Sequence, residues 1–162
     1  MYSYFLSLWI LATRLPTFLP MTGYSIDHIG IAVNSLAEAV PAFRALLGIN
    51  VSGTDEVPSE GVRVAFFGEG SGRIELLEST EPDSPIARCL ERRGQGVHHV
   101  CLRVSDLVST LERVEEEGLT VLEPRIRRGA GGHLVAFLHP RGTAGVLVEL
   151  SEEPAATDPS SN

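Results

Sequence analysis

The chain has 162 residues, with 21 acidic side chains, 13 basic side chains and a formal net charge of −8. All 13 basic residues are arginine, so Schiff-base, pyridoxal and P-loop lysine chemistry is excluded, and any anionic ligand must be held by arginine, backbone amides or a metal. The acidic balance argues against nucleic-acid binding, and the length allows one domain or two small modules that share a core.

The first 23 residues are apolar and carry a single charge, Arg14. Their apolar run, Tyr4 to Ala12, is shorter than the roughly 20 residues needed to cross a bilayer, so we expect no membrane span. The segment is either a signal or anchor without a positive n-region, or the result of a start codon assigned upstream of the true start at Met21. We favour the second interpretation and expect the domain to begin at residue 24.

A first module is expected in residues 24–80. Residues 26–33 alternate like a strand, with His28 on one face and the large aliphatic side chains on the other. Residues 35–48 have a helical pattern, in which Pro41 is tolerable only if the helix starts late or kinks. Apolar runs joined by Gly-rich turns follow and predict further strands.

A second module, residues 96–150, repeats the first. Residues 97–107, VHHVCLRVSDL, match residues 26–36, IDHIGIAVNSL, at an offset of 71. Each module therefore reads βαβββ, and the first of its last three strands is weakly marked. We predict an α+β fold over residues 24–150, in which the two tandem modules pair into a curved, half-open, barrel-like sheet around a metal site. The tail, residues 151–162, is polar and is predicted to be disordered.

The repeat places two pairs of chemically reactive residues in matching positions. His28 and His99 lie on the first strand of each module, and Glu75 and Glu149 lie on the last. We call these four residues the His/Glu cluster. Each histidine alone is best explained as a strand residue that bonds to backbone, but a duplication that keeps His and Glu in register favours a divalent metal site, with Co, Mn, Ni or Zn as the candidate ions.

Two neighbours of the cluster are weaker candidates. Alternation turns His98 to the face opposite His99, so packing with a backbone hydrogen bond is the favoured interpretation. Cys101 lies on the same face as His99 and could touch a substrate, but a small packed thiol is the more ordinary role.

Over residues 26–150 the chain resembles the vicinal oxygen chelate superfamily and, within it, the methylmalonyl-CoA epimerases. The superfamily feature is the paired βαβββ module with His and Glu ligands. The more specific motifs, in chain order, are IDHIGIAV, EVPSEGVRVAF, IELLE, DSPIARCLERRGQGVHHV, GAGG, VAFLHP and GVLVEL.

The resemblance implies metal-dependent epimerisation of (2R)/(2S)-methylmalonyl-CoA by 1,1-proton transfer through a metal-stabilised enolate. It implies the His/Glu cluster as metal ligands and Glu149 as a catalytic base. For the second acid/base, Glu75 is the first choice, and His139 or a bound water are the alternatives. Some bacterial epimerases have a second glutamate where this chain has Val64, so the residue in this role stays open.

An acyl-CoA thioester would need cationic or amide contacts for its phosphates. Arg125, Arg127 and Arg128 before a Gly-rich turn, and Arg141 after the HP motif, are the candidates, although a solvated basic loop explains them equally well.

Two other functions remain open, both within the same superfamily. One is a glyoxalase I type lactoylglutathione lyase, and the other is a non-catalytic module that binds a small ligand. A homodimer is expected by resemblance. Two cysteines, Cys89 and Cys101, are too few for a disulfide framework and favour a reducing compartment, the cytoplasm.

Overall fold

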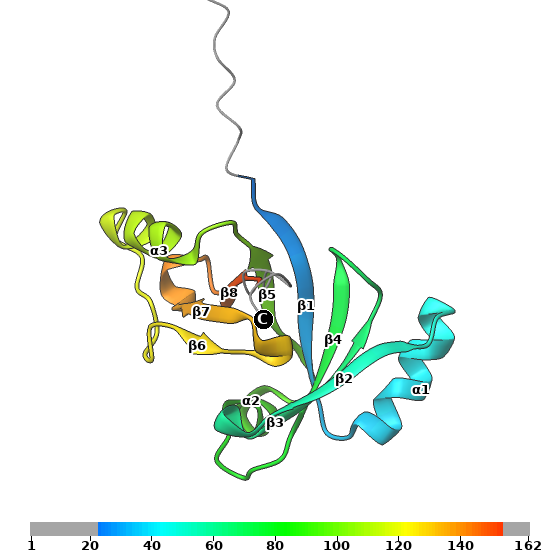
Figure 1. The fold of residues 1–162 in the computed structure, drawn as a ribbon. Helices are drawn as coiled ribbons and strands as arrows, with labels where there is room; N and C mark the ends of the chain where they lie inside the picture. The colour runs from blue at the N-terminus through cyan, green and yellow to red at the C-terminus, as the bar shows by residue number, and fades with distance from the viewer. Residues whose placement is uncertain (1–22, 154–162) are drawn as a thin grey trace, which may run out of the picture.

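The computed structural model describes residues 23–153. One curved eight-stranded sheet, in the order β2-β3-β4-β1-β5-β8-β7-β6, carries the whole described fold. In Figure 1, α1 and α3 lie at opposite ends of this sheet, and β1 runs through its middle. The strands are β1 (Ser25–Val33), β2 (Val51–Val57), β3 (Val62–Phe67), β4 (Arg73–Ser79), β5 (Gly96–Arg103), β6 (Arg127–Arg128), β7 (Leu134–Leu138) and β8 (Val148–Glu152), and the helices are α1 (Leu36–Leu47), α2 (Pro85–Arg93) and α3 (Leu107–Glu116).

The duplication predicted from the sequence is present in the topology. Module one is β1-α1-β2-β3-β4, module two is β5-α3-β6-β7-β8, and α2 connects them. The first strand of each module pairs in parallel with the last strand of the same module, and β1 pairs antiparallel with β5 across the centre. The predicted α+β, half-open arrangement of two βαβββ modules is thereby confirmed. The first of the last three strands, which the sequence pattern marks weakly, differs in length between the modules: β2 has seven residues and β6 has two.

The two long helices begin in equivalent ways. The amide of Leu36 donates to Glu78 Oε2 at 3.1 Å, and the amide of Leu107 donates to Glu152 Oε2 at 2.6 Å. A carboxylate at a helix N-terminus satisfies an otherwise unpaired amide and complements the helix dipole. Each module therefore ties the start of its helix to the end of its own last strand. Strand β8 runs to Glu152, which pairs with Leu134 of β7, so it ends two residues past the boundary expected at 150.

Helix α1 differs from the sequence expectation at Pro41. The helix begins at Leu36, so Pro41 lies in its interior, and of the two expected alternatives, a late start or a kink, the late start is wrong. Pro41 is exposed, as is most of the helix, and among its residues only Leu36 is buried. The lost hydrogen bond therefore falls in a helix that depends on few packing contacts.

Three apolar clusters position the elements. One packs α1 on β3 and β4, and another packs α3 on β7 and β8 through Leu107 and Leu111. The third packs Ile86 and Cys89 of α2 against Ala32, Val64 and other residues of module one. Ala32 lies four residues after His28 on β1, so α2 covers part of the same sheet face that carries this histidine. No helix in residues 23–153 is long and apolar enough to span a membrane, and the leader and most of the tail fall outside the described residues.

Candidate metal centre

The His/Glu cluster converges at one point on the concave face of the sheet. Nε2 of His28 and Nε2 of His99 lie 3.1 Å apart. Glu75 Oε2 lies 3.2 Å from His28 Nε2, and Glu149 Oε2 lies 2.9 Å from His99 Nε2. All four residues are between 3% and 7% exposed. Four strands, two from each module, thus bring two imidazoles and two carboxylates together away from water. The potential ligand atoms of His28, His99 and Glu149 all lie within 4.8 Å of one another, whereas Glu75 is not part of that closer group.

Sheet register explains this convergence. Gly30 of β1 pairs with His99 of β5, and Glu75 of β4 pairs with Gly30 from the other side. A Cβ atom on Gly30 would lie 2.3 Å from Cε1 of His99, so the imidazole occupies the space above the glycine. The small residue next to His28 therefore makes room for the histidine of the other module.

The electrostatics of the cluster favour paired charges. Burial by itself would lower the pKa of His99, but hydrogen bonds with Glu149 and Glu75 raise it to about 9. Burial would raise the pKa of Glu149, but hydrogen bonds with the two histidines lower it to about 2. Against the effect of burial, hydrogen bonds with Asp27, Cys101 and the two glutamates raise the pKa of His28, and hydrogen bonds with the two histidines lower the pKa of Glu75. In the metal-free protein these contacts therefore favour the cationic form of the histidines and the anionic form of the glutamates.

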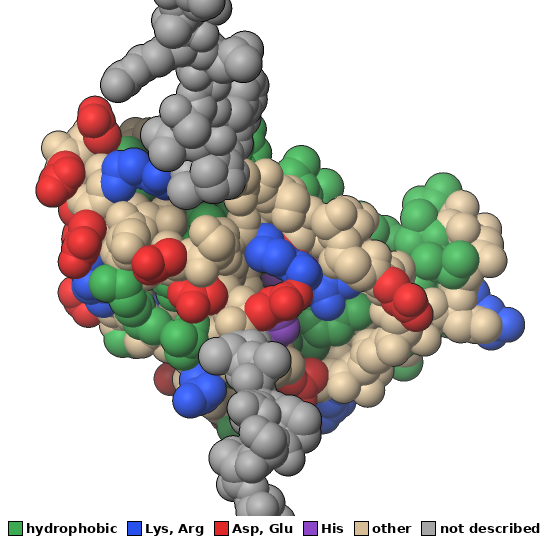
Figure 2. All heavy atoms as spheres, turned by 45° about the horizontal axis from the view of Figure 1, so that its top comes forward, with side chains coloured by type: hydrophobic (Ala, Val, Ile, Leu, Met, Phe, Trp, Pro, Cys, Tyr) green, Lys and Arg blue, Asp and Glu red, His purple; other side chains and the backbone are tan. Residues whose placement is uncertain are grey.

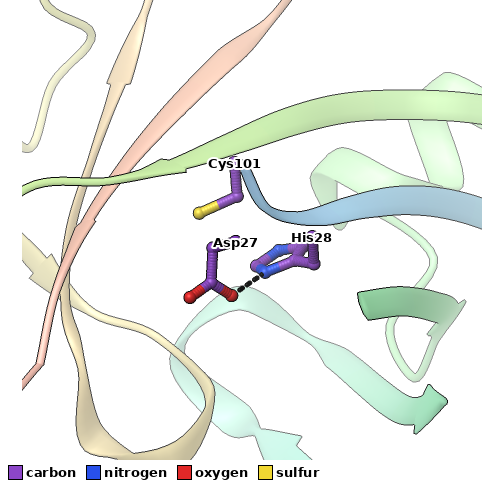
Figure 3. A group of neighbouring side chains, drawn as sticks. All are labelled: Asp27, His28 and Cys101. Carbon is purple, nitrogen blue, oxygen red and sulfur yellow. Dashed lines mark hydrogen bonds and ion pairs between the residues drawn. The ribbon is translucent and has the colours of Figure 1, made fainter. Parts of the chain in front are cut away.

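Asp27 contacts the His/Glu cluster, although the sequence pattern did not single it out. Alternation would turn it away from His28, yet Asp27 Oδ1 accepts a hydrogen bond from His28 Nδ1 at 2.8 Å. The reason is a register shift, since Ile26 pairs with Leu102 and His28 with Cys101, which leaves Asp27 as the extra residue of a β-bulge. Figure 3 shows the carboxylate of Asp27 beside the ring of His28.

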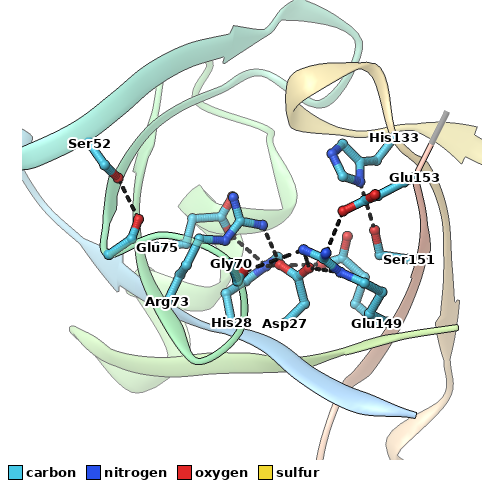
Figure 4. A network of polar contacts seen from close by, with 12 residues as sticks. Asp27, His28, Ser52, Gly70, Arg73, Glu75, His133, Glu149, Ser151 and Glu153 are labelled. Atoms are coloured by element: carbon cyan, nitrogen blue, oxygen red, sulfur yellow. Dashed lines mark hydrogen bonds and ion pairs between the residues drawn. The ribbon is translucent and has the colours of Figure 1, made fainter. Parts of the chain in front are cut away.

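Two arginines hold this carboxylate. Arg73 donates to Asp27 Oδ1, and Arg103 donates to Oδ2 through Nε at 2.7 Å and through Nη2. Burial would raise the pKa of Asp27, but hydrogen bonds from His28, Arg73 and Arg103 hold it well below its usual range. Figure 4 shows Asp27 at the centre of this network, with Glu153 at its outer end. Asp27 is 1% exposed, so it is a buried, fully paired anion.

A second potential ligand group, Asp27, His28 and Cys101, fits a cation less well. The oxygens of Asp27 already accept from two guanidinium groups, whose charges would repel a metal ion. Burial raises the pKa of the Cys101 thiol to about 11, so the thiolate needed for metal binding is disfavoured. The described chain therefore offers its better metal-binding geometry at the His/Glu cluster.

His98 does not lie where alternation predicts. Gly30 pairs with His99 and Ile31 with Val97, so His98 is the extra residue of a second bulge. Its Nδ1 lies 3.0 Å from Nδ1 of His99, and the predicted packing role with a backbone hydrogen bond is replaced by this contact between rings. Burial and the neighbouring His99 lower the pKa of His98 to about 4, so its ring is neutral at physiological pH.

A cavity of about 350 Å³ opens beside the cluster. Its polar lining includes Glu75, Glu149 and His98. Its apolar lining includes Val62, Val64, Leu77, Ile86, Val135 and Phe137. A smaller cavity of about 70 Å³ shares Glu75 and Glu149, and is lined by Asp27 and Arg73. In the face shown in Figure 2, side chains of both charges gather near the centre, and a histidine is visible among them.

The predicted arginines divide into two groups. Arg127 and Arg128 line the larger cavity, and Arg127 also donates to Glu60 Oε1 at 3.2 Å. Arg125 instead pairs with Glu115 at 2.7 Å, away from the cavity. Arg141 is exposed on a turn and does not line the cavity either.

Arg88 and His139 also differ from expectation. Arg88 on α2 lines the cavity, although the sequence pattern did not single it out. His139 lines neither cavity, and its Nδ1 accepts from the amide of Arg141 at 3.0 Å, so it caps the turn instead of facing the cluster.

Comparison with known proteins identifies the family. The model of the Glyoxalase/Bleomycin resistance protein/Dioxygenase superfamily matches residues 27–137. The chain belongs to this superfamily. An ethylmalonyl-CoA/methylmalonyl-CoA epimerase of Cereibacter sphaeroides is 40% identical over 131 residues, which cover 78% of this chain and 96% of the relative. The mitochondrial methylmalonyl-CoA epimerase of Homo sapiens is 35% identical over 128 residues, covering 78% and 73%.

A solved structure agrees with these relatives. A variant of Streptomyces coelicolor methylmalonyl-CoA epimerase, in complex with 2-nitronate-propionyl-CoA, superposes with a TM-score of 0.76 and 36% identity, and the match covers 81% of this chain and 98% of that one. Within the superfamily, the chain is thus a member of the methylmalonyl-CoA epimerase family, a family of isomerases.

Proposed function

We propose that the protein catalyses metal-dependent epimerisation of methylmalonyl-CoA. The observation that carries this proposal is the His/Glu cluster in the wall of an apolar cavity, with two carboxylates that also line the cavity. The similarity to methylmalonyl-CoA epimerases, one of them solved with a bound acyl-CoA analogue, supports the substrate class. The acyl-CoA would occupy the larger cavity.

The cluster fits a divalent metal ion. Two neutral imidazole nitrogens and two carboxylate oxygens suit borderline ions such as Co, Mn, Ni or Zn. The buried carboxylates of Glu75 and Glu149 otherwise depend on the two histidines alone for compensating charge, since both arginines nearby are engaged by Asp27. His28, Glu75, His99 and Glu149 are therefore the proposed ligands. When bound there, a divalent cation supplies Lewis-acid stabilisation of negative charge on the thioester oxygen.

Glu149 is the proposed base. Epimerisation requires a proton to leave the carbon between the carboxylate and the thioester on one face and to return on the other. Glu149 is buried and anionic, and it lines the cavity from β8, so its carboxylate can take the proton. Glu75 lines the same cavity from β4, on the other module, and is the proposed proton carrier for the opposite face. To donate there, Glu75 would first take up a proton from solvent, and Glu149 would release the abstracted proton to solvent after turnover.

The apolar lining also has a role in this proposal. It would keep water away from the substrate carbon that loses its proton, so that water does not compete with the glutamates as a proton donor. Val64 belongs to this lining and is 1% exposed, so no carboxylate is supplied at its position. Among the described residues, Glu75 is therefore the carboxylate best placed to act opposite Glu149.

For the CoA phosphates we propose Arg88, Arg127 and Arg128. All three line the larger cavity, and guanidinium groups bind phosphate oxygens in a bidentate manner. A homodimer and a cytoplasmic location stay predictions from the sequence.

A solvent-exchange assay tests the proposal. The metal-replete protein is incubated with methylmalonyl-CoA in deuterium oxide, and deuterium at C2 is followed by mass spectrometry. We expect exchange that stops on addition of chelator and returns with Co or Mn. Absence of exchange with every restored metal would contradict the proposal, and turnover of a methylglyoxal–glutathione adduct in its place would favour the lyase.

A further inference from the structure

The two bulges occupy equivalent positions in the duplicated modules. Asp27 directly precedes His28, and His98 directly precedes His99, so the two extra residues are related by the same offset of 71 as the two histidines. Each bulge turns a side chain that alternation would place on the far face toward the Nδ1 atom of the following histidine. The duplication therefore repeats a supporting contact as well as a histidine.

We infer that Asp27 and His98 are positioning residues that fix the ring orientation and tautomer of His28 and His99. The inference rests on the proposed function, because it takes the His/Glu cluster as the metal site. A histidine that binds a metal through Nε2 must carry its proton on Nδ1, and an acceptor at Nδ1 holds that tautomer. Asp27 Oδ1 supplies the acceptor at 2.8 Å, and His98 Nδ1 supplies it at 3.0 Å.

The two supports differ in charge and surroundings. Asp27 is a carboxylate kept in place by Arg73 and Arg103, which prevent it from rotating toward the cluster as a further ligand. His98 is a half-buried imidazole in the wall of the larger cavity, and no arginine among the described residues donates a hydrogen bond to it. A carboxylate acceptor forms the stronger, charge-assisted bond. The contact at Nδ1 of His28 is therefore the stronger of the two supporting contacts.

Metal affinity provides the test. Wild type, Asp27→Asn and His98→Leu are stripped of metal and titrated with Co²⁺ against a coloured chelator. Loss of an outer partner of a ligating histidine typically weakens binding by about 10- to 100-fold, and we expect a loss in this range for Asp27→Asn and a smaller one for His98→Leu. Glu56→Gln, an acid-to-amide change in an exposed pair with Arg63, is the matched control and should bind like wild type. Unchanged affinity in both test variants would overturn the inference.

A second measurement needs no variant, in case Asp27→Asn does not fold. Nitrogen-15 NMR of the Zn²⁺-loaded wild type reports which ring nitrogen carries the proton. We expect His28 and His99 to be protonated at Nδ1, with slowly exchanging protons. A proton on Nε2 of either residue would overturn its assigned role.

A His28→Ala variant separates failure of this inference from failure of the proposed function. If wild type and His28→Ala bind Co²⁺ equally, the cluster is not the metal site, and both proposals fail. If His28→Ala loses binding while Asp27→Asn and His98→Leu retain it, only the positioning role is overturned.

Discussion

The backbone of Gly30 on β1 packs directly against the imidazole of His99 on β5, so module one contacts the proposed metal-site histidine of module two. A Cβ atom on Gly30 would lie 2.3 Å from Cε1 and 2.6 Å from Nε2 of His99. Such contacts are far shorter than van der Waals separation, so any side chain at residue 30 must displace the ring. The geometry of the cluster thus depends on a residue that carries no functional group.

Gly30→Ala is accordingly expected to weaken metal binding while the fold survives. A displacement of about 1 Å in a site of this kind can reduce the rate about 100-fold. The measurements are Co²⁺ affinity and solvent exchange at C2. Gly53→Ala on β2 is the control, because a Cβ atom there meets nothing within 4 Å. Equal behaviour of the two variants would show that the contact does not constrain the ring.

Metal binding should release protons at pH 7. The pKa of His99 is raised to about 9 in the metal-free protein and that of His28 is also raised, so both rings are protonated, whereas a ligating Nε2 carries no proton. The apparent affinity should therefore rise as pH increases from 7 toward 9 and fall at lower pH. Calorimetry in buffers of different ionisation enthalpy counts the protons released. An observed heat that is independent of the buffer would contradict the expected protonation state.

Glu149→Gln should separate proton transfer from binding. The amide cannot accept the proton, so exchange at C2 should slow by about 10²- to 10⁴-fold. Because Glu149 is also a proposed metal ligand, retained binding of both Co²⁺ and acyl-CoA, measured by calorimetry, would show that the metal site and the cavity are intact. Glu112→Gln, which alters an exposed carboxylate on α3 outside the cavity lining, is the control and should keep its exchange rate. A Glu149→Gln variant that exchanges at the wild-type rate would exclude Glu149 as the base.

Leu111→Ala should test the packing of α3. Leu111 is fully buried in the cluster that joins α3 to β7 and β8, and truncation of such a leucine costs about 2–5 kcal/mol. Chemical denaturation of the metal-free protein measures the change in the free energy of unfolding. Leu46→Ala on α1 is the matched control, since Leu46 is 76% exposed and its loss should cost less than about 0.5 kcal/mol. Similar losses in both variants would contradict the packing described for α3.

Much of the candidate site could be predicted from the sequence because it follows local rules. Alternation with a period of two fixed the faces of His28 and His99, and the offset of 71 related the two modules. The carboxylates at residues 75 and 149 came from the same repeat. A duplicated pattern has to satisfy the same strand geometry twice, so it carries more information than any single histidine.

Sequence rules failed wherever the backbone departs from regular geometry. A β-bulge inserts one residue and reverses the face of its side chain, and no composition signal marks the bulges at Asp27 and His98. Sequence rules also missed Arg88 as a residue of the cavity. Arg88 lies on α2, far in sequence from Arg127, and the two arginines line one cavity because α2 packs on the sheet.

The sequence by itself therefore determined the duplication, the βαβββ order and the four residues of the His/Glu cluster, because strand alternation and internal repetition are properties of the chain. Only the tertiary structure decided which residues support those four, which arginines reach the cavity and how closely Gly30 approaches His99. These depend on β-bulges and on contacts between distant segments, which form only when the two modules pair across β1 and β5.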